Sequence, residues 1–240
     1  MTVRGLRPLS ILSVLLVGAG FTMAFFWAPL DVDQGFRQKI FYLHVPLGIV
    51  ALIGFILGGI HGLRYLRNGG SEADLRSYVS IHISQIFAVA VLVTGAIWGK
   101  TAWGAWWRWD EPFLVSFLIV FLLYCTYQPL RLSIDDPRRQ ARAASVFAVV
   151  AGAFVPINFA VVRLADQYLH PRTLSNAADG SMPGSVLLTF LTCLVAISVL
   201  YATLVRYELL SKSTTFRLRA LERRAGGDDL IPRRSAVPQA

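Results

Sequence analysis

The residues best suited to bind a flat ligand are five tryptophans in WGKTAWGAWWRWDEP, residues 98–112. The whole chain has only six tryptophans, so one short segment holds nearly all of them. Indole rings are flat, apolar and polarizable, with an N–H donor at the rim. A short helix over residues 102–109 would place four side chains on one face: Trp103, Trp106, Trp107 and Asp110. With Trp109 beside them, they predict a platform for a large planar hydrophobic ligand.

Two of the four histidines belong with this segment. His44 lies in PheTyrLeuHisValPro, and His170 lies in AspGlnTyrLeuHisProArg within the long connection of residues 163–184. A connection of that length is uncommon unless it has a function or is disordered. Two imidazoles on opposite sides of a planar ring form an axial pair for haem iron. The residues therefore suggest a haem site with His44 and His170 as ligands.

Cations near the same segment would suit acidic groups at the edge of such a ligand, because guanidinium groups bind carboxylates through paired hydrogen bonds. The candidates for the two haem propionates are Arg108, Arg163 and Arg172. We expect Asp110 to fix the end of the platform or to contact a partner.

The elements that must position these residues are membrane-spanning helices. Of the 240 residues, 55% are hydrophobic and 15% are charged, whereas soluble domains have roughly 25% charged residues. The apolar residues fall into six runs, each near the ~20 residues that cross a bilayer. Because backbone amides cannot stay unpaired in lipid, the runs should be helices, and the fold class is all-α. The six spans are placed at residues 9–27, 40–63, 78–98, 113–130, 143–162 and 185–205.

The distribution of lysine and arginine predicts the orientation of the spans. Six spans put both termini on one side, and cytoplasmic connections are enriched in these residues. Seventeen of the 23 lie on the side of the termini and six on the other. The termini are therefore expected in the cytoplasm, and the tryptophan segment, between the third and fourth spans, is expected outside. His44 and His170 share the outer face, while His61 and His82 lie at the inner ends of spans.

Composition also limits the alternatives. The net charge of +9 is largely this topology signal, and no nucleic-acid-binding pattern is present. Cys125 and Cys193 lie in apolar runs without a CxxC spacing, which is typical of buried, unreactive cysteines. Gly54-x-x-x-Gly58 and Gly95-x-x-x-Gly99 are typical of close helix packing. We divide the chain into a six-helix domain, residues 1–208, and a basic cytoplasmic tail, residues 209–240, that is partly disordered.

Two stretches carry a family resemblance. The Trp106-Trp107 pair with Trp109-Asp110, outside and between spans three and four, resembles the "WWD" signature of haem-handling proteins of cytochrome c maturation. LysIlePheTyrLeuHisValPro, residues 39–46, resembles the first histidine motif of the six-span CcmC family. The likeness covers about residues 5–208. It departs at His170, which neither follows a Trp-Trp pair nor precedes Gln, as the second histidine of the family often does.

The resemblance implies a haem-handling protein of the bacterial inner membrane that is not an enzyme. By position, His44 and His170 would ligate haem b against the tryptophan segment on the external face. The haem would then pass to a periplasmic haem chaperone. The implied partners are that chaperone, an ABC-type ATPase and permease, and a small single-span accessory protein; the lipid bilayer surrounds the chain, and nucleic acid is not a partner.

Two other functions fit the same residues. In an electron-transfer cytochrome, His44 with His170 and His61 with His82 would hold two bis-histidine haems, one at each leaflet. In a permease subunit, a substrate would cross the membrane along the spans. Transport paths show polar residues at midspan or broken helices, and the spans here have few polar residues, chiefly Thr94, Asn158 and Thr192.

Overall fold

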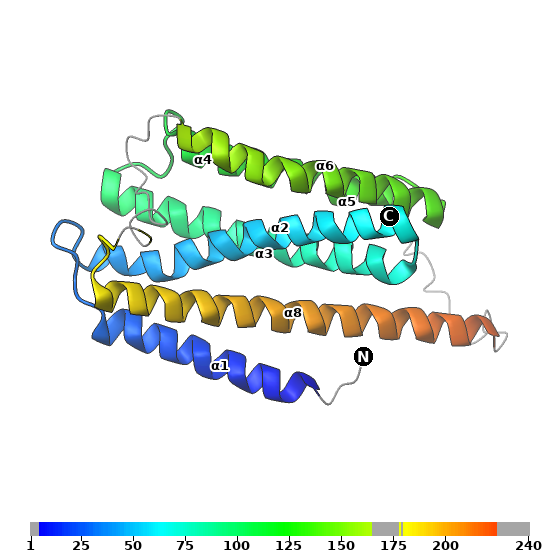
Figure 1. The fold of residues 1–240 in the computed structure, drawn as a ribbon, viewed down its shortest axis with the longest axis horizontal. Coiled ribbons are helices and arrows are strands. Elements are labelled where there is room, and N and C mark those ends of the chain that lie inside the picture. The colour runs from blue at the N-terminus through cyan, green and yellow to red at the C-terminus, as the bar shows by residue number, and fades with distance from the viewer. Residues whose placement is uncertain (1–4, 165–177, 179, 225–240) are drawn as a thin grey trace, which may run out of the picture.

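The protein is a bundle of long helices that run along one axis (Figure 1). The computed structural model describes residues 5–164, 178 and 180–224. Six helical stretches are long and apolar enough to cross a membrane, as predicted. No strand is present among the described residues. The helices, in chain order, are α1 (Leu6–Thr22) with its π-helical extension η2 (Met23–Trp27), the 3-10 turn η3 (Phe36–Ile40), α2 (Phe41–Asn68), α3 (Ser71–Trp103), α4 (Pro112–Cys125), α5 (Tyr127–Leu132), α6 (Pro137–Leu164) and α8 (Gly184–Arg224).

Helix α2 is at the centre, where it contacts α3, α6 and α8. Glycines on α2 let these neighbours approach closely. A methyl group at Gly54 would lie 2.1 Å from the Ser84 hydroxyl oxygen of α3, and one at Gly59 would lie 2.8 Å from the Ala148 carbonyl oxygen of α6. In lipid, such contacts between small residues are a main source of helix association. The helix-packing interpretation of the first glycine pair, Gly54 and Gly58, is therefore confirmed.

The helices extend beyond the apolar runs from which they were predicted. Helix α3 begins at Ser71, with Glu72 and Asp74 in its first turn, where acidic groups meet the positive end of the helix dipole. Helix α8 continues without interruption past residue 208 to Arg224. Charged and polar residues thus extend the helices past the predicted ends of the spans.

A partly buried ion pair joins α3 to α5. Arg131 donates to both carboxylate oxygens of Asp74, at 2.7 and 2.9 Å, and the two side chains are only 13% and 17% exposed. The Arg131 guanidinium also lies over the rings of Tyr78 and Tyr127. This cluster ties the α4–α5–α6 region to the first turn of α3. We call this end of the bundle the arginine end.

The opposite end, here the tryptophan end, carries the start of α2, the end of α3 and the start of α4 (left in Figure 1). Two longer connections, residues 28–35 and 104–111, lie here. The start of α1 points toward the arginine end, where Ser10 contacts Tyr207 of α8, and α8 runs on beyond it (Figure 1).

Candidate functional site

His44 is in the first turns of α2, on the side that faces α3. Its side chain is buried, with 9% exposed. The Nδ1 atom lies 3.0 Å from the Thr94 hydroxyl oxygen of α3. The imidazole also meets the Trp98 ring edge to face, with centroids 5.7 Å apart and planes at 78°. Two contacts from α3 therefore fix the orientation of this imidazole.

Gly95 has no side chain and so leaves room for the imidazole against α3. A methyl group on Gly95 would lie 2.8 Å from His44 Cε1 and 3.5 Å from Nδ1. The ring therefore occupies space that any other residue at this position would fill. Gly95 was interpreted from sequence only as a helix-packing glycine, and the structure shows that what packs against it is the candidate ligand. We call Thr94, Gly95 and Trp98 the His44 cradle.

The connection between η2 and η3 is tied to the end of α3. Trp98 donates its indole N–H to Gln34 Oε1 at 2.8 Å, and Arg37 donates to the Thr101 carbonyl. Lys39 is buried and donates to the carbonyls of Ala28 and Pro29. Trp98 therefore bridges this connection and His44, with one contact to each.

The short helix expected over residues 102–109 is wrong. Helix α3 ends at Trp103, and residues 104–111 have no helical assignment. Gly104 caps α3 in the left-handed region with φ of 78°, a conformation that glycine adopts without steric cost. Beyond it the chain folds back, so that a methyl group on Gly99 would lie 3.1 Å from the Ala105 carbonyl oxygen. The tryptophans do have i, i+3, i+4 spacing, but the backbone between them is not helical, so this spacing does not place them on one helix face.

The four predicted platform tryptophans differ in burial. Trp106 and Trp109 are 59% and 74% exposed, whereas Trp103 and Trp107 are half-buried. The Trp107 and Trp109 rings meet edge to face, with centroids 5.9 Å apart and planes at 65°. The indole N–H of Trp107 is buried and has no hydrogen-bond partner within the described part of the chain. Burial of an N–H donor costs free energy unless an acceptor forms a hydrogen bond with it.

Arg108 and Asp110 contact each other. Arg108 donates to both carboxylate oxygens of Asp110, at 2.8 and 2.5 Å. These hydrogen bonds hold the pKa of the Asp110 carboxyl down to about 2 and raise the pKa of Arg108. Both residues were predicted site residues with separate tasks. The structure brings them together as an exposed ion pair, so an acidic ligand group would compete with Asp110 for Arg108.

Glu111 was not singled out from the sequence. It is buried, with 1% exposed, and precedes the first residue of α4. Its place beside Asp110 in the chain gave no signal of burial, because adjacent carboxylates usually both face water.

Three predicted site residues cannot be placed. His170 and Arg172 lie outside the described residues. The backbone of Arg163 is in the last turn of α6, but its side chain is outside the part of the chain that the structure describes. The pairing of His44 with His170 therefore stays a prediction.

The second histidine pair, His61 with His82, has separate surroundings. His61 Nδ1 lies 3.4 Å from Arg64, whereas His82 stacks on Tyr78 with centroids 5.9 Å apart. These neighbours are different, so the described contacts lend no support to a second axial pair.

Comparison with known proteins shows the family of the chain. The family model described as "Heme exporter protein C" matches residues 1–224. The chain belongs to the heme exporter protein C family.

Relatives with that name include one from Bradyrhizobium diazoefficiens, 30% identical over 92% of this chain and 84% of its own. Another, from Rhodobacter capsulatus, is 28% identical over 88% of each chain. A third, from Haemophilus influenzae, is 30% identical over 85% of this chain and 84% of its own. The match to the heme exporter protein C family thus covers all six spans.

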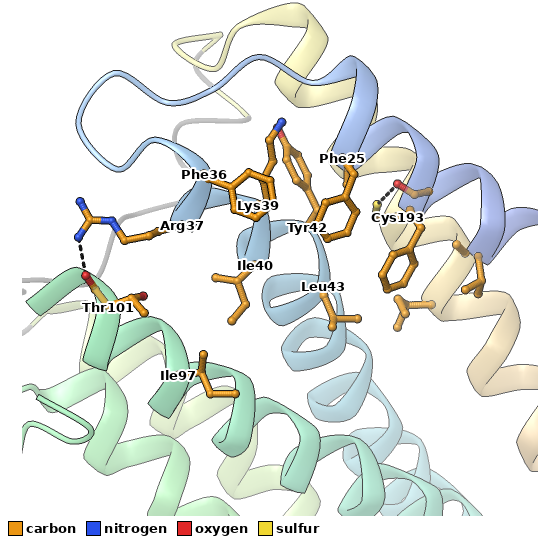
Figure 2. Close-up of a pocket in the computed structure, with 16 residues that line it drawn as sticks. Phe25, Phe36, Arg37, Lys39, Ile40, Tyr42, Leu43, Ile97, Thr101 and Cys193 are labelled. Carbon is orange, nitrogen blue, oxygen red and sulfur yellow. Dashed lines mark hydrogen bonds between the residues drawn. The ribbon is translucent and has the colours of Figure 1, made fainter. Parts of the chain in front are cut away.

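An apolar cleft is separate from the His44 cradle in this member of the heme exporter protein C family. It has a volume of about 350 Å³ and lies between α1 and α8 on one side and α2 and α3 on the other (Figure 2). Leu43, Ile97 and Thr101 line the α2–α3 wall, and Cys193 lies on α8 with its thiol 3.6 Å from the Gly20 carbonyl oxygen. Neither His44 nor any tryptophan lines it.

Proposed function

We propose that the protein binds haem b at the external face of the membrane and delivers it to a periplasmic haem chaperone for c-type cytochrome assembly. Membership of the heme exporter protein C family supports a role in haem delivery for cytochrome c maturation, and the six apolar helices make the chain a multi-pass membrane protein. In this proposal His44 and His170 are the axial ligands of the iron.

The observation that carries the proposal is the burial of His44 in its cradle. A metal ligand needs a fixed ring and a second group that holds it, usually through the ring nitrogen that does not bind the metal. His44 has such a group in Thr94, and Gly95 leaves room for the ring. The surroundings of His44 also suit a porphyrin, since Trp98 lies against the imidazole. In the tryptophan segment, Trp107 adds a buried N–H donor.

The tryptophan segment supplies a surface for the cargo and for its receiver. We propose that Trp103 and Trp107 contact the haem, while the exposed Trp106 and Trp109 lie where haem enters or where the chaperone docks. The Arg108–Asp110 pair would open as a propionate takes the place of Asp110, and Arg163 and Arg172 remain the other propionate candidates. Haem must leave this site, so an open edge is needed, and exposed indoles provide one.

The remaining parts of the proposal follow the family. The protein performs no chemistry on its cargo, so it is a carrier and not an enzyme. An ABC-type ATPase and permease and a small single-span protein are its proposed membrane partners. The tryptophan end faces the periplasm, and the arginine end, with most of the lysine and arginine residues, faces the cytoplasm.

Absorption spectra of the detergent-purified protein test the proposal. Wild-type protein should bind one haem per chain with a bis-imidazole spectrum. His44→Ala and His170→Ala should each lose that spectrum, and His61→Ala should keep it. Two haems per chain, one of which is lost with His61, would instead make the protein an electron-transfer cytochrome. Unchanged haem binding in His44→Ala would refute the assignment of the ligand.

A further inference from the structure

The Thr94 hydroxyl is positioned to select one tautomer of His44. It lies 2.7 Å from the Ala90 carbonyl oxygen and 3.2 Å from the Val91 carbonyl oxygen, one turn back along α3. It also lies 3.0 Å from His44 Nδ1. A hydroxyl has a single proton to donate and can accept with its lone pairs.

The Thr94 hydroxyl donates its proton to a backbone carbonyl of its own helix, that of Ala90. The contact with the Ala90 carbonyl is the shortest of the three, and threonines in apolar helices commonly donate to the carbonyl four residues earlier. With its proton so placed, the hydroxyl accepts from His44, and the Val91 carbonyl is a second acceptor for the same ring. The imidazole must then carry its proton on Nδ1, and the lone pair is on Nε2.

We infer that Thr94 is a positioning residue that holds His44 as the Nδ1–H tautomer and thereby directs Nε2 to serve as the iron ligand. The inference deepens the proposed function and depends on it for the iron. The tautomer itself does not depend on iron, but on the geometry of Thr94 and His44 and of the Ala90 and Val91 carbonyls. Thr94 does not touch the iron in this arrangement; it acts through the imidazole.

The hydrogen bond also sets the donor strength of the ligand. An Nδ1–H that donates to an oxygen gives the imidazole more negative character, which favours ferric over ferrous iron. Removal of the acceptor should therefore raise the reduction potential of the bound haem. Loss of such an outer partner typically costs ~10–100-fold in metal affinity. Thr94 had appeared in the sequence only as an isolated polar residue at midspan.

The matched variants are Thr94→Val, which removes the hydroxyl at nearly constant shape, and Thr94→Ser, which keeps it. Thr192→Val is the control. Its hydroxyl donates to the Leu188 carbonyl at 2.9 Å, the same bond to a carbonyl one turn back, but from a half-buried position on α8. An effect of simply deleting a hydroxyl that is bonded to its own helix would appear in both valine variants.

The first measurement needs no haem. Nitrogen-15 NMR of histidine-labelled, haem-free protein distinguishes protonated from unprotonated ring nitrogens, and His44→Ala identifies the His44 signals. We expect Nδ1–H in wild type and Thr94→Ser, and a shift toward Nε2–H in Thr94→Val. An Nε2–H signal in wild type would overturn the inference, whatever the haem experiments show.

The second measurement uses haem. Thr94→Val should bind haem ~10–100-fold more weakly than wild type and show a higher reduction potential, while Thr94→Ser and Thr192→Val match wild type. Equal affinity and potential in Thr94→Val would overturn the link to iron. If wild type shows the Nδ1–H tautomer but His44→Ala still binds haem normally, the assignment of His44 as the iron ligand in the proposed function fails and the tautomer assignment stands.

Discussion

The substitution Gly95→Ala tests the His44 cradle most directly, because it adds one methyl group at a known place. That methyl would lie 2.8 Å from His44 Cε1, whereas ordinary contacts begin near 3.4 Å. The buried imidazole must therefore retreat by about 0.6 Å or α2 and α3 must separate. A binding site tolerates displacements of only ~0.5 Å, and overpacking of this kind costs ~1–3 kcal/mol. Because the imidazole must return to its original position to bind haem, this cost is taken from the binding free energy. Since ~1.4 kcal/mol is a factor of ten, we expect haem affinity to fall by roughly ten- to a hundredfold.

Haem titration of purified protein, followed by absorbance, measures this change. Gly48→Ala is the matched control, because it adds the same methyl to the α2–α3 interface, where the nearest atom would be Val91 Cγ2 at an ordinary 3.9 Å. We expect the control to match wild type in affinity and thermal midpoint. If Gly95→Ala is folded and binds haem with wild-type affinity and spectrum, the reasoning about the cradle is refuted.

The remaining predictions concern the arginine end, the ion pair and the orientation. Asp74→Asn should lower the free energy of unfolding by ~1.5–3 kcal/mol, because it removes the carboxylate charge from the hydrogen bonds of the partly buried Arg131. Glu72→Gln, in a pair exposed by 38% and 75%, should cost at most ~1 kcal/mol. Equal effects in denaturation experiments would contradict this. The lowered pKa of Asp110 means that its charge is lost only as pH falls toward about 2, so Asp110→Asn should leave the shape of the haem affinity profile between roughly pH 5 and pH 8 unchanged. The loss of a titration step from that range in the variant would contradict the lowered pKa, because it would mean that the Asp110 carboxyl titrates there in wild type. In a chain whose Cys125 and Cys193 are replaced by serine, a membrane-impermeant thiol reagent should label Ala105→Cys from the periplasm and Asp135→Cys only after permeabilisation, and the reverse pattern would invert the proposed topology.

The spans could be predicted from the sequence because a run of about twenty apolar residues has only one stable form in lipid. The contacts that build the site could not. Thr94 and Gly95 meet His44 across two helices, and the relative rotation of α2 and α3 depends on packing that no local pattern reports. His44 itself was predicted as a ligand, while its cradle was not.

The prediction of a helix in the tryptophan segment was wrong, and the sequence shows part of the reason. Spacing of i, i+3 and i+4 places side chains together only if the backbone is helical, and Gly104 ends α3 one residue after Trp103. The Arg108–Asp110 pair is a further sign, because residues two apart do not face each other on a helix. Two predicted site residues thus meet because the segment is irregular.

Among the described residues, the connections between helices are shorter at the arginine end than at the tryptophan end. At the arginine end, Gly69 and Gly70 alone join α2 to α3, both with positive φ, and residues 133–136 join α5 to α6. At the tryptophan end, each described connection has eight residues. Within the described residues, the arginine end therefore presents only short connections to a partner protein. In the proposed topology, the extended part of α8, which continues to Arg224, is the main surface for a cytoplasmic partner.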